Sequence, residues 1–526
     1  MHLPQIAGKT KSPLTISDIA PKFDSTNLAA TILYAVLALA AIVLLVLLAT
    51  LPAEGQTETV LYNFSGHGDG SIPTSALVWD GAGNLYGTTV VGGSCDGWNQ
   101  YGCGVVFELS PNGSGGWNQS VLHTFSAPPD GANPFCAPVI FDSVGNIYGT
   151  TEFGGTYNSG SVYELSPVAG GRTDSILYSF NYNANGDHPS TGLTMDAAGN
   201  LYGTNSEYES PGGVFELSPS AGGWNYQVIY LAPTAQGVTM DAAGNLFGAT
   251  DSTVFELSPD GNGGWNPTVI HTFTGAPDDG ISPYAAPVLD AAGNLYGTTS
   301  AGGANNLGAV YKLIPGGNGE WTEQILYSFA PGNGGNDPRA GVVLDAAGNL
   351  YGTTSQGGTK NKNYGTVFEL IALGGSNYQY SVVWAFNGKD GSFSEAGVTL
   401  DSVGNLYGTT AQGGTSKSGV VFEVSGVRRP TAAALTSAPN PSTYGQPVTF
   451  TAVITPAPPD GEAVSFMKGK TKIVLGTGLL SGGAATFTTS ALPVGSTKVM
   501  AVYGGDSALI GSTSNAVKQL VKRAKK

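Results

Sequence analysis

The sequence predicts an all-β protein. We expect a seven-bladed β-propeller closed by an N-terminal strand, a smaller β-sandwich after it, and one N-terminal transmembrane helix or signal segment before it. One turn pattern, in which Asp, two small residues, Gly and Asn precede an apolar and an aromatic residue, recurs seven times. A repeat of this length is typical of propellers and solenoids. The 79 glycines and the 11% of charged residues suit many short strands joined by tight turns.

Residues 28–51 form an uncharged stretch that comes after three lysines and precedes two glutamates. The basic side of such a segment stays in the cytoplasm. We therefore expect a cytoplasmic leader at 1–27, a transmembrane or signal segment at 28–51, and export of the chain beyond residue 51. The stretch is longer than the core of a usual signal peptide, which favours an uncleaved anchor, whereas Ala53-Glu54-Gly55 would serve as a cleavage site. A buried core helix is the weaker alternative, because nothing else in the chain is helical enough to cover it. Whether the segment is cleaved stays open.

One complete unit shows how the repeat builds a blade. Apolar and polar residues alternate over 76–80, 84–89, 104–110 and 120–125, and turn-forming residues separate these runs. Four antiparallel strands per unit make the blade of a propeller. The seven turns begin at Asp80, Asp142, Asp196, Asp241, Asp290, Asp345 and Asp401.

The strand count predicts how the ring closes. The pattern of the fourth strand already occurs at 59–64, before the first complete unit, and the last unit ends at its third strand, 420–424. The early strand is therefore expected to complete the last blade, which gives a propeller over 56–427. Closure removes exposed sheet edges, and an open solenoid would not need this additional strand.

The repeats resemble the exported bacterial GloVer-type (Gloeo_Verruco) tandem-repeat family. The resemblance rests on Gly-Asn-Leu-Tyr-Gly-Thr-Thr, Val-Phe-Glu-Leu-Ser-Pro and Asp-Gly-x-x-Pro, which stand in the first unit at 83–89, 106–111 and 69–73. It covers all seven units and implies no particular activity. The turn is also similar to that of NHL-type propellers. The fourth unit departs from the pattern at 245–250 and is the shortest, and the fifth has Lys312 where the others have Glu.

The composition changes after the last repeat. Short alternating runs rich in Thr, Val and Ala predict an antiparallel sandwich without a disulfide over 428–519. This stretch resembles bacterial Ig-like repeat domains at 437–442, 445–452 and 501–506, and the resemblance implies a spacing or adhesion module. The basic end of the chain, with 520–526 as a tail, is expected to be solvated; a contact with acidic envelope polymers is the alternative.

Charge and cysteines restrict the partners and the compartment. A net charge of −16 repels phosphate backbones, so we expect no nucleic-acid partner. Cys95 and Cys103 flank one loop and would form a disulfide in an oxidising compartment, with two free thiols as the alternative. Cys136 is expected to be a small buried residue rather than a nucleophile.

Residues that recur in nearly every unit are expected to be structural. The turn Asp accepts backbone hydrogen bonds and the turn Gly adopts positive φ, whereas a ring of Ca²⁺ sites would need more oxygen ligands than one turn offers. The third-strand Glu is expected to pair across strands, and the tryptophans after that strand are expected to pack between blades rather than to stack on sugars. His123 and His271 take the place of tyrosines and are expected to be structural.

Topology places the variable loops on one face of the predicted propeller. This face carries an Asp in nearly every loop from fourth to first strand, two histidines, and the aromatic residues of the Cys95–Cys103 loop, while the short fourth unit leaves a notch. Because function concentrates in variable loops, we predict a ligand site there, with the alternative that each Asp only begins a turn. The candidate binding residues are Asp69, Asp130, Asp187, Asp279, Asp337, Asp390, His67, His188, Trp98 and Tyr101.

The leading functional hypothesis is a non-enzymatic, exported or envelope-anchored binding or adhesion protein. Its ligand would be a glycan or another surface polymer, or a protein, with Ca²⁺ as the one ion we consider and no other cofactor. One alternative is an exported carbohydrate-active hydrolase or lyase at the channel mouth, with His67, Asp69, Asp187 and His188 as candidates. Another is a purely structural envelope protein. No phosphate-binding loop, nucleophile elbow or zinc Cys/His motif is present, so we predict no catalytic residue, and the oligomeric state stays open.

Overall fold

The computed structural model describes a chain of strands. It covers residues 56–524 apart from 96–99, 127, 182–185, 206–211, 233, 318, 333, 359–361, 373–376, 427–428, 456, 459, 470–472 and 506–508. The segment predicted to be transmembrane or a signal, 28–51, lies outside the described residues. Among the residues that are described, no helix has the length and apolar character needed to cross a bilayer. The all-β prediction is confirmed for this part of the chain.

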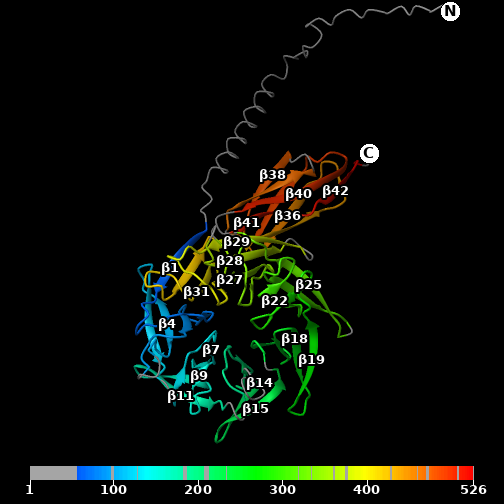
Figure 1. The fold of residues 1–526 in the computed structure, drawn as a ribbon. Coiled ribbons are helices and arrows are strands. Elements are labelled where there is room, and N and C mark those ends of the chain that lie inside the picture. The colour runs from blue at the N-terminus through cyan, green and yellow to red at the C-terminus, as the bar shows by residue number, and fades with distance from the viewer. Residues whose placement is uncertain are drawn as a thin grey trace, which may run out of the picture. The chain divides into compact units, whose positions relative to one another are not determined.

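The repeat region folds into four-stranded antiparallel sheets, which we number in chain order. Figure 1 shows them following one another around a ring. Sheets 1 to 3 consist of β2 (Val78–Trp79), β3 (Leu85–Thr89), β4 (Val105–Pro111) and β5 (Trp117–Thr124); β7 (Ile140–Phe141), β8 (Ile147–Thr151), β10 (Ser161–Val168) and β11 (Gly171–Ser179); and β12 (Thr194–Met195), β13 (Leu201–Asn205), β14 (Gly213–Ser220) and β15 (Gly223–Leu231).

Sheets 4 to 6 repeat the arrangement of the first three. They consist of β16 (Val238–Met240), β17 (Leu246–Ala249), β18 (Thr253–Pro259) and β19 (Trp265–Thr272); β21 (Val288–Leu289), β22 (Leu295–Thr299), β24 (Ala309–Pro315) and β25 (Trp321–Ser328); and β26 (Val343–Leu344), β27 (Leu350–Thr354), β28 (Thr366–Ala372) and β29 (Tyr378–Ala385). The outer fourth strands are longer than the inner first strands, which span two or three residues.

Sheet 7 combines strands from opposite ends of the repeat region. It contains β30 (Thr399–Leu400), β31 (Leu406–Thr410) and β32 (Val420–Ser425), and its fourth strand is β1 (Thr57–Asn63). The antiparallel register of β1 on β32 runs from Thr57 opposite Ser425 to Asn63 opposite Val420, with a bulge after Val60. The early strand therefore lies beside the third strand of the last unit, which is the pairing that the strand count predicts.

Hydroxyl groups bond successive sheets near the ring centre. The side chain of Thr409 in sheet 7 donates to the Ser75 carbonyl in sheet 1 at 3.1 Å, so the last sheet also bonds the first. The equivalent threonines are Thr88, Thr150, Thr204, Thr298 and Thr353, and each bonds the backbone of the next sheet. In sheet 4 this position is Ala249, which has no hydroxyl. The contact from sheet 4 to sheet 5 therefore lacks this bond.

The recurrent glycine of the second strand makes room for an aromatic ring. A methyl group built on Gly352 would lie 2.6 Å from the Phe368 ring, and one on Gly87 would lie 2.7 Å from the Phe107 ring. These third-strand rings are fully buried. Glycine is needed here because the ring occupies the space of a side chain, so the Gly-Thr-Thr motif is a packing feature of the sheet.

The recurrent turn is closed by its own Asp and Asn. In the first unit, Oδ1 of Asp80 accepts hydrogen bonds from the backbone of Ala82 and Asn84, both at 2.8 Å. The second carboxylate oxygen accepts from the Asn84 amide and the Tyr86 hydroxyl. Partial burial raises the pKa of Asp80, but these hydrogen bonds outweigh it and hold the pKa below its ordinary value. Both oxygens of this carboxylate are therefore engaged within the turn itself, which is the structural role expected of it.

Tryptophans pack between sheets. Trp117 begins β5, because a backbone bond from Asn112 to Gly116 closes the preceding turn early. Its ring lies 6.4 Å from Tyr407 of sheet 7, and Trp265 of sheet 4 lies 5.7 Å from Tyr202 of sheet 3. These contacts agree with the packing role expected from the sequence.

The C-terminal region is a two-sheet sandwich with its own core around Phe450 and Phe466. The smaller sheet contains β34 (Ala432–Ala438), β36 (Val448–Thr455) and β39 (Ala484–Thr489), and the larger contains β33 (Arg429–Pro430), β35 (Ser442–Thr443), β37 (Ala463–Lys468), β38 (Ile473–Leu479), β40 (Gly495–Gly505), β41 (Leu509–Thr513) and β42 (Val517–Lys522).

The predicted basic tail begins too early. β42 pairs with β40 along 517–521, and Val521 is buried in the sandwich core. Along this strand the side chains of Lys518, Leu520 and Lys522 face solvent, and those of Gln519 and Val521, which alternate with them, face inward. The basic segment near the end of the chain therefore forms a strand, and the sandwich extends to Lys522 rather than ending at residue 519.

The pairing of β1 with β32 buries a carboxyl group with an unusual pKa. Oε1 of Glu58 is buried without a hydrogen-bond partner among the described residues. Burial first, and the charge of Asp390 second, raise the pKa of Glu58 to about 8. The group therefore costs stability whenever it is ionised in the folded chain.

We expect the repeat region to lose stability as the pH rises through this window. Below the unfolded pKa of about 4.5 both states are protonated, and above it the folded state binds more protons until its own pKa of about 8 is passed. After allowance for partial exposure, the loss between pH 5 and 9 should exceed that of Glu58→Gln by about 1–2 kcal/mol. Urea unfolding followed by tryptophan fluorescence at both pH values measures it, and equal losses in the two proteins would contradict the assignment.

Candidate functional site

The predicted variable loops pair with each other beside five of the seven sheets. In sheet 2 the loop before the first strand pairs with the loop after the second, through β6 (Gly131–Ala132) and β9 (Phe153–Gly154). In sheet 5 the same pairing uses β20 (Gly280–Ile281) and β23 (Ala301–Gly302). Isolated bridges make the equivalent contact in sheets 1, 6 and 7: Ser71–Val91, Asn336–Gln356 and Ser392–Gln412. These two sets of loops therefore lie on the same face.

A cavity of about 530 Å³ lies where these loops reach the inner strands. Its wall contains the residue four positions before each turn Asp, and this residue is always small: Ala76, Pro138, Gly192, Gly237, Ala286, Gly341 and Gly397. Small side chains at all seven positions leave the centre of the ring open.

The residue six positions before each turn Asp also lines this cavity in six units, and here the units differ. We call these residues the mouth ring: Thr74, Cys136, Ser190, Tyr284, Arg339 and Glu395. In the short fourth unit, Gln236 lines the cavity instead. The strands and turns around the cavity repeat seven times. The polar, aromatic or charged side chain that each unit places at the opening differs from unit to unit.

Arg339 organises the charges of the mouth ring. Its Nε donates to Oδ2 of Asp337 at 3.1 Å, and Nη1 donates to Oε1 of Glu395 in the next sheet at 3.0 Å. The guanidinium lies over the Tyr284 ring, 5.9 Å from its centre. Partial burial lowers the pKa of Arg339, but the charges of Asp337 and Glu395 outweigh it and raise the pKa above its ordinary value. The group is a permanent cation shared between two carboxylates.

Cys136 brings a thiol to this cavity. Its backbone donates to the Thr74 hydroxyl in the neighbouring sheet at 3.1 Å, and its sulfur forms no disulfide. Burial first, and the charge of Glu395 second, raise the pKa of this thiol to about 12. The thiolate is the nucleophilic form, so Cys136 is not poised for nucleophilic attack at neutral pH. A thiol that is not activated agrees with the expectation from the sequence, whereas its burial is only partial, because Cys136 lines the cavity.

Four of the predicted aspartates organise their own loops. The carboxylates of Asp69, Asp130, Asp279 and Asp390 each accept a backbone N–H at the start of the loop, from Ser65, Ser126, Thr274 and Asn387 respectively. Asp187 is only 2% exposed and pairs with His188 at 3.1 Å. For the first four, the backbone contacts favour the interpretation in which the Asp begins a turn. Asp337 is the one predicted aspartate that reaches the mouth ring, through Arg339.

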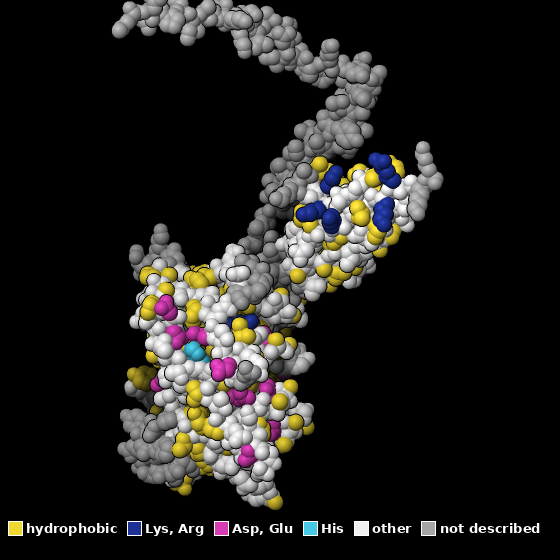
Figure 2. Space-filling view, turned by 90° about the vertical axis from the view of Figure 1, so that its right-hand side faces the viewer, with side chains coloured by type: hydrophobic (Ala, Val, Ile, Leu, Met, Phe, Trp, Pro, Cys, Tyr) yellow, Lys and Arg dark blue, Asp and Glu magenta, His cyan; other side chains and the backbone are white. Residues whose placement is uncertain are grey.

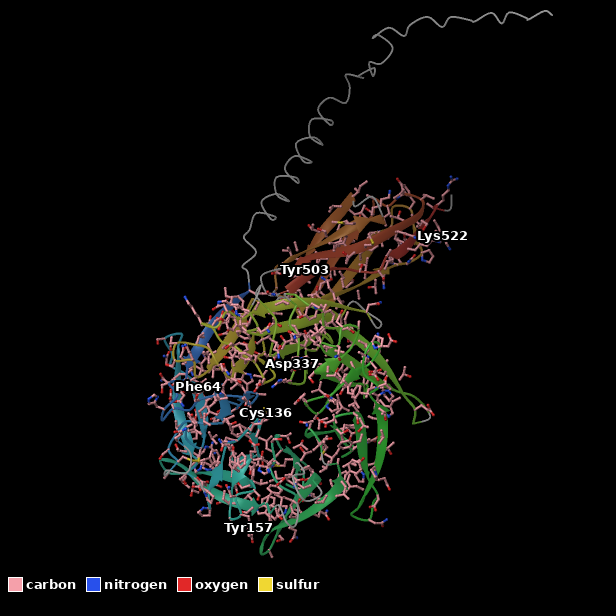
Figure 3. The ribbon with its side chains drawn as sticks, in the orientation of Figure 1. Phe64, Cys136, Tyr157, Asp337, Tyr503 and Lys522 are labelled. Atoms are coloured by element: carbon pink, nitrogen blue, oxygen red, sulfur yellow. A yellow bond between two sulfur atoms is a disulfide. The ribbon has the colours of Figure 1, made fainter. Side chains whose placement is uncertain are left out.

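The other predicted binding residues that the structure describes lie away from the cavity. His67 is exposed and contacts the Ser65 carbonyl, His188 packs against Phe153, and Tyr101 is 67% exposed. Trp98 lies outside the described residues. Asp69, His67, Asp187 and His188, the candidates for a hydrolase or lyase, do not line the cavity. In Figure 3, Cys136 and Asp337 lie on the inner side of the ring and Tyr157 on its outer side.

Cys95 and Cys103 form a disulfide, with their Cα atoms 5.2 Å apart. Both half-cystines are buried in the core shared by sheets 1 and 2. The bridge closes the loop that was predicted to lie on the variable face.

The two histidines expected to replace tyrosines as structural residues each lie beside two carboxylates. His123 is close to Asp130 and Asp174, and its surroundings form an open hollow of about 780 Å³. His271 is close to Asp279 and Glu323. In each group, the His and one acid lie on outer strands of successive sheets, and the other acid comes from the loop between them. Burial first, and the charge of Asp279 second, raise the pKa of Glu323 to about 8.

Sequence reasoning missed Tyr284, Arg339 and Glu395. The available signal was the register of the repeats, because a count of six residues back from each turn Asp reaches the mouth ring. The charge pattern adds weight to Arg339, since acidic residues far outnumber basic ones in the repeats. In Figure 2, Lys and Arg gather on the sandwich, while Asp and Glu are scattered over the repeat region.

Family models match most of the chain. The Gloeobacter/Verrucomicrobia repeat model matches residues 47–252 and 233–437, and a model of the bacterial Ig-like domain (group 3) matches residues 435–522. No curated protein matches the chain.

Solved structures give weak likenesses. The extracellular domain of a protein described as a hybrid two-component system from B. thetaiotaomicron is 12% identical over 89% of this chain, with a TM-score of 0.43. The chain spans 59% of the length of that protein chain. A protein of unknown function from Dyadobacter fermentans is 12% identical over 62% of this chain and 98% of its own, with a TM-score of 0.31. These values are too low to transfer a function.

Proposed function

The chain belongs to the Gloeobacter/Verrucomicrobia repeat family, and from that premise we propose that it is an exported, non-enzymatic binding protein. Residues 56–427 would be a seven-bladed propeller closed by β1, and the Ig-like sandwich would hold this domain away from the cell surface. The pairing of β1 with β32 and the hydroxyl bond from Thr409 to Ser75 support the closed ring. The uncharged stretch at 28–51 supports export, with the segment either retained as an anchor or removed.

The mouth ring carries the proposal of a ligand site. Its residues differ from unit to unit while the frame that holds them repeats, and they surround a cavity of about 530 Å³. Binding sites commonly combine a concave, partly apolar wall with a few polar groups. Membership of a fold family does not identify a ligand, so we infer the ligand class from the chemistry of the side chains at the opening.

A glycan is the ligand class that this opening suits best. Tyr284 is 47% exposed, which leaves part of its ring free to stack on a sugar face. Arg339, Glu395, Ser190 and Gln236 offer hydrogen-bond donors and acceptors around it. Arg339 is already paired with two carboxylates, so the opening favours a neutral polar ligand over a strongly charged one.

We expect Tyr284→Ala and Arg339→Ala each to weaken glycan binding at least tenfold, which corresponds to the loss of about 1.4 kcal/mol or more from a central contact. The probe is an array of bacterial and plant surface polysaccharides, read with the purified protein in Ca²⁺ and in EDTA. Tyr157→Ala removes an exposed tyrosine outside the cavity and should bind as the unaltered protein does.

The array separates the proposed function from its alternatives. No binding by the unaltered protein to any polysaccharide, or equal binding by all three variants, would reject the mouth ring as a glycan site. Shortening of a bound polysaccharide that stops in Arg339→Ala would instead identify a hydrolase or lyase at the same opening. If Asp69→Ala were the only variant to lose binding, the result would place the ligand site on the acidic loops instead.

A further inference from the structure

We propose that His271, Asp279 and Glu323 bind one divalent transition-metal ion of the Zn²⁺ class, which joins sheet 4 to sheet 5. His271 lies on β19, the outer strand of sheet 4, and Glu323 lies on β25, the outer strand of sheet 5. Asp279 lies in the loop that connects the two sheets, directly before β20. Three separate elements thus bring one nitrogen and two carboxylate oxygens to within 4.8 Å of one another.

The three atoms that face each other are buried and without hydrogen-bond partners among the described residues: Nε2 of His271, Oδ1 of Asp279 and Oε1 of Glu323. Asp279 as a whole is only 7% exposed. Leaving such groups unpaired in the interior costs about 1–3 kcal/mol each, and more when they are charged. A cation between them would satisfy all three at once. A proton shared by the two carboxylates is the alternative that the experiment must separate from a metal.

The distances suit a tetrahedral ion. Nε2 of His271 lies 3.6 Å from Oδ1 of Asp279 and 3.5 Å from Oε1 of Glu323. Zinc bonds of about 2.0–2.2 Å to nitrogen and oxygen give tetrahedral edges of about 3.3–3.6 Å, which matches both distances. The histidine nitrogen argues against Ca²⁺ and Mg²⁺, which take oxygen ligands. Water would take the fourth position.

The surrounding contacts hold two of these ligands in place. The other oxygen of Asp279 accepts hydrogen bonds from the backbone and hydroxyl of Thr274, at 2.6 and 2.9 Å. The ring of His271 packs edge-on against the buried Phe273, with centres 4.7 Å apart. Outer contacts of this kind fix the orientation of metal ligands.

The position of the site gives it a structural task. The site spans sheets 4 and 5. At every other junction between successive sheets a threonine hydroxyl bonds one sheet to the next, but at this junction the equivalent residue is Ala249. A metal bridge on the outer strands would tie together the two sheets that lack this inner hydroxyl bond. We therefore expect the ion to act as a clamp between repeats.

At other junctions between sheets, the equivalent side chains show how this position can be occupied without a metal. At the junction of sheets 7 and 1, the residues are Tyr62, Asp69 and Gln119, and the Tyr62 hydroxyl donates directly to Asp69 at 2.9 Å. At the junction of sheets 1 and 2, Nε2 of His123 faces the Asp130 oxygen that already accepts from Ser126, and Asp174 is exposed. Of these three groups, the one around His271 is therefore the one in which all three facing atoms are buried and make no hydrogen bond with the described residues.

The test uses replacements that the chain itself contains. His271→Tyr/Glu323→Gln converts the site to the Tyr62 and Gln119 arrangement, so the fold should tolerate it. His123→Tyr/Asp174→Gln is the matched control at the junction of sheets 1 and 2. The full-length proteins are stripped with EDTA, dialysed against Zn²⁺ and washed. Bound zinc is then measured by mass spectrometry and the melting temperature by tryptophan fluorescence.

We expect one zinc per chain and a higher melting temperature for the unaltered protein and for the control, and neither effect in His271→Tyr/Glu323→Gln. Equal zinc content in the unaltered protein and this variant would overturn the proposal. Equal stability with and without Zn²⁺ would do the same, because it would leave the shared proton as the sufficient partner. If the variant fails to fold, Co²⁺ in the unaltered protein decides: intense visible absorption of a four-coordinate ion supports the site, and its absence rejects it.

Discussion

The double variant Thr57→Cys/Ser425→Cys is expected to form a disulfide that raises the free energy of unfolding of the repeat region by on the order of 5 kcal/mol. The two residues lie directly opposite each other at the surface end of β1 and β32, and their hydroxyl oxygens are 2.8 Å apart. The bridge would close almost the whole repeat region into one covalent loop. Because the entropy removed from the unfolded chain grows with loop length, few positions offer a larger effect.

The measurement is urea unfolding followed by tryptophan fluorescence, which reports on the repeat region because all seven tryptophans lie within it. Peptide mapping without reducing agent identifies the new bridge beside the Cys95–Cys103 disulfide. The unaltered protein, measured with and without dithiothreitol, corrects for reduction of that native bridge. A double variant that stays reduced in oxidising buffer would reject the proposed closure of the ring by β1.

The sequence predicted the parts of the fold that depend on repetition. The pattern of four strands, the turn at each Asp and the role of 59–64 all derive from comparing units with one another, and the structure contains the corresponding strands. Strand ends were less predictable. The run expected at 120–125 begins at Trp117, because hydrogen bonds in the turn set the start of a strand and the alternation of side chains does not.

The candidate site was less predictable than the fold. The prediction concentrated on aspartates that recur from loop to loop, and most of these carboxylates bind their own backbone. The mouth ring depends on residues that do not recur, such as Tyr284 and Arg339, so a search for repeated chemistry passes over them. One can predict that these residues meet only if the register of each inner strand is known. Strands of two residues are too short for the sequence pattern to show their register.

The group at His271 illustrates a different obstacle. Its ligands are 8 and 44 positions apart along the chain, and no local motif links them. They meet because outer strands of successive sheets lie side by side, a contact between units rather than within one. Only the substitution of His for the usual Tyr marks the place in the sequence, and that change alone is compatible with simple packing.

Removing the ring of Phe368 is expected to destabilise the repeat region by about 3–5 kcal/mol. Phe368 is fully buried, packs edge-on against Phe329 at 5.4 Å and lies over Gly352 of the neighbouring strand. Phe368→Ala leaves a cavity that rigid neighbouring sheets cannot fill, so the loss combines the transfer and cavity terms. Urea unfolding followed by tryptophan fluorescence measures it, and a loss below about 1 kcal/mol would contradict tight packing between the ring and the glycine.

A double-mutant cycle tests why the glycine is there. A methyl group at position 352 would lie 2.6 Å from the Phe368 ring, so Gly352→Ala alone should cost about 1–3 kcal/mol. In the Phe368→Ala background the same methyl group meets no ring, and the lower chain entropy of Ala should make the change neutral or stabilising by up to about 1 kcal/mol. Gly81→Ala, in a turn where an added methyl group meets nothing within 4 Å, is the matched control and should change stability little. Additive costs at 352 and 368 would show that the glycine is required by the backbone and not by the ring that covers it.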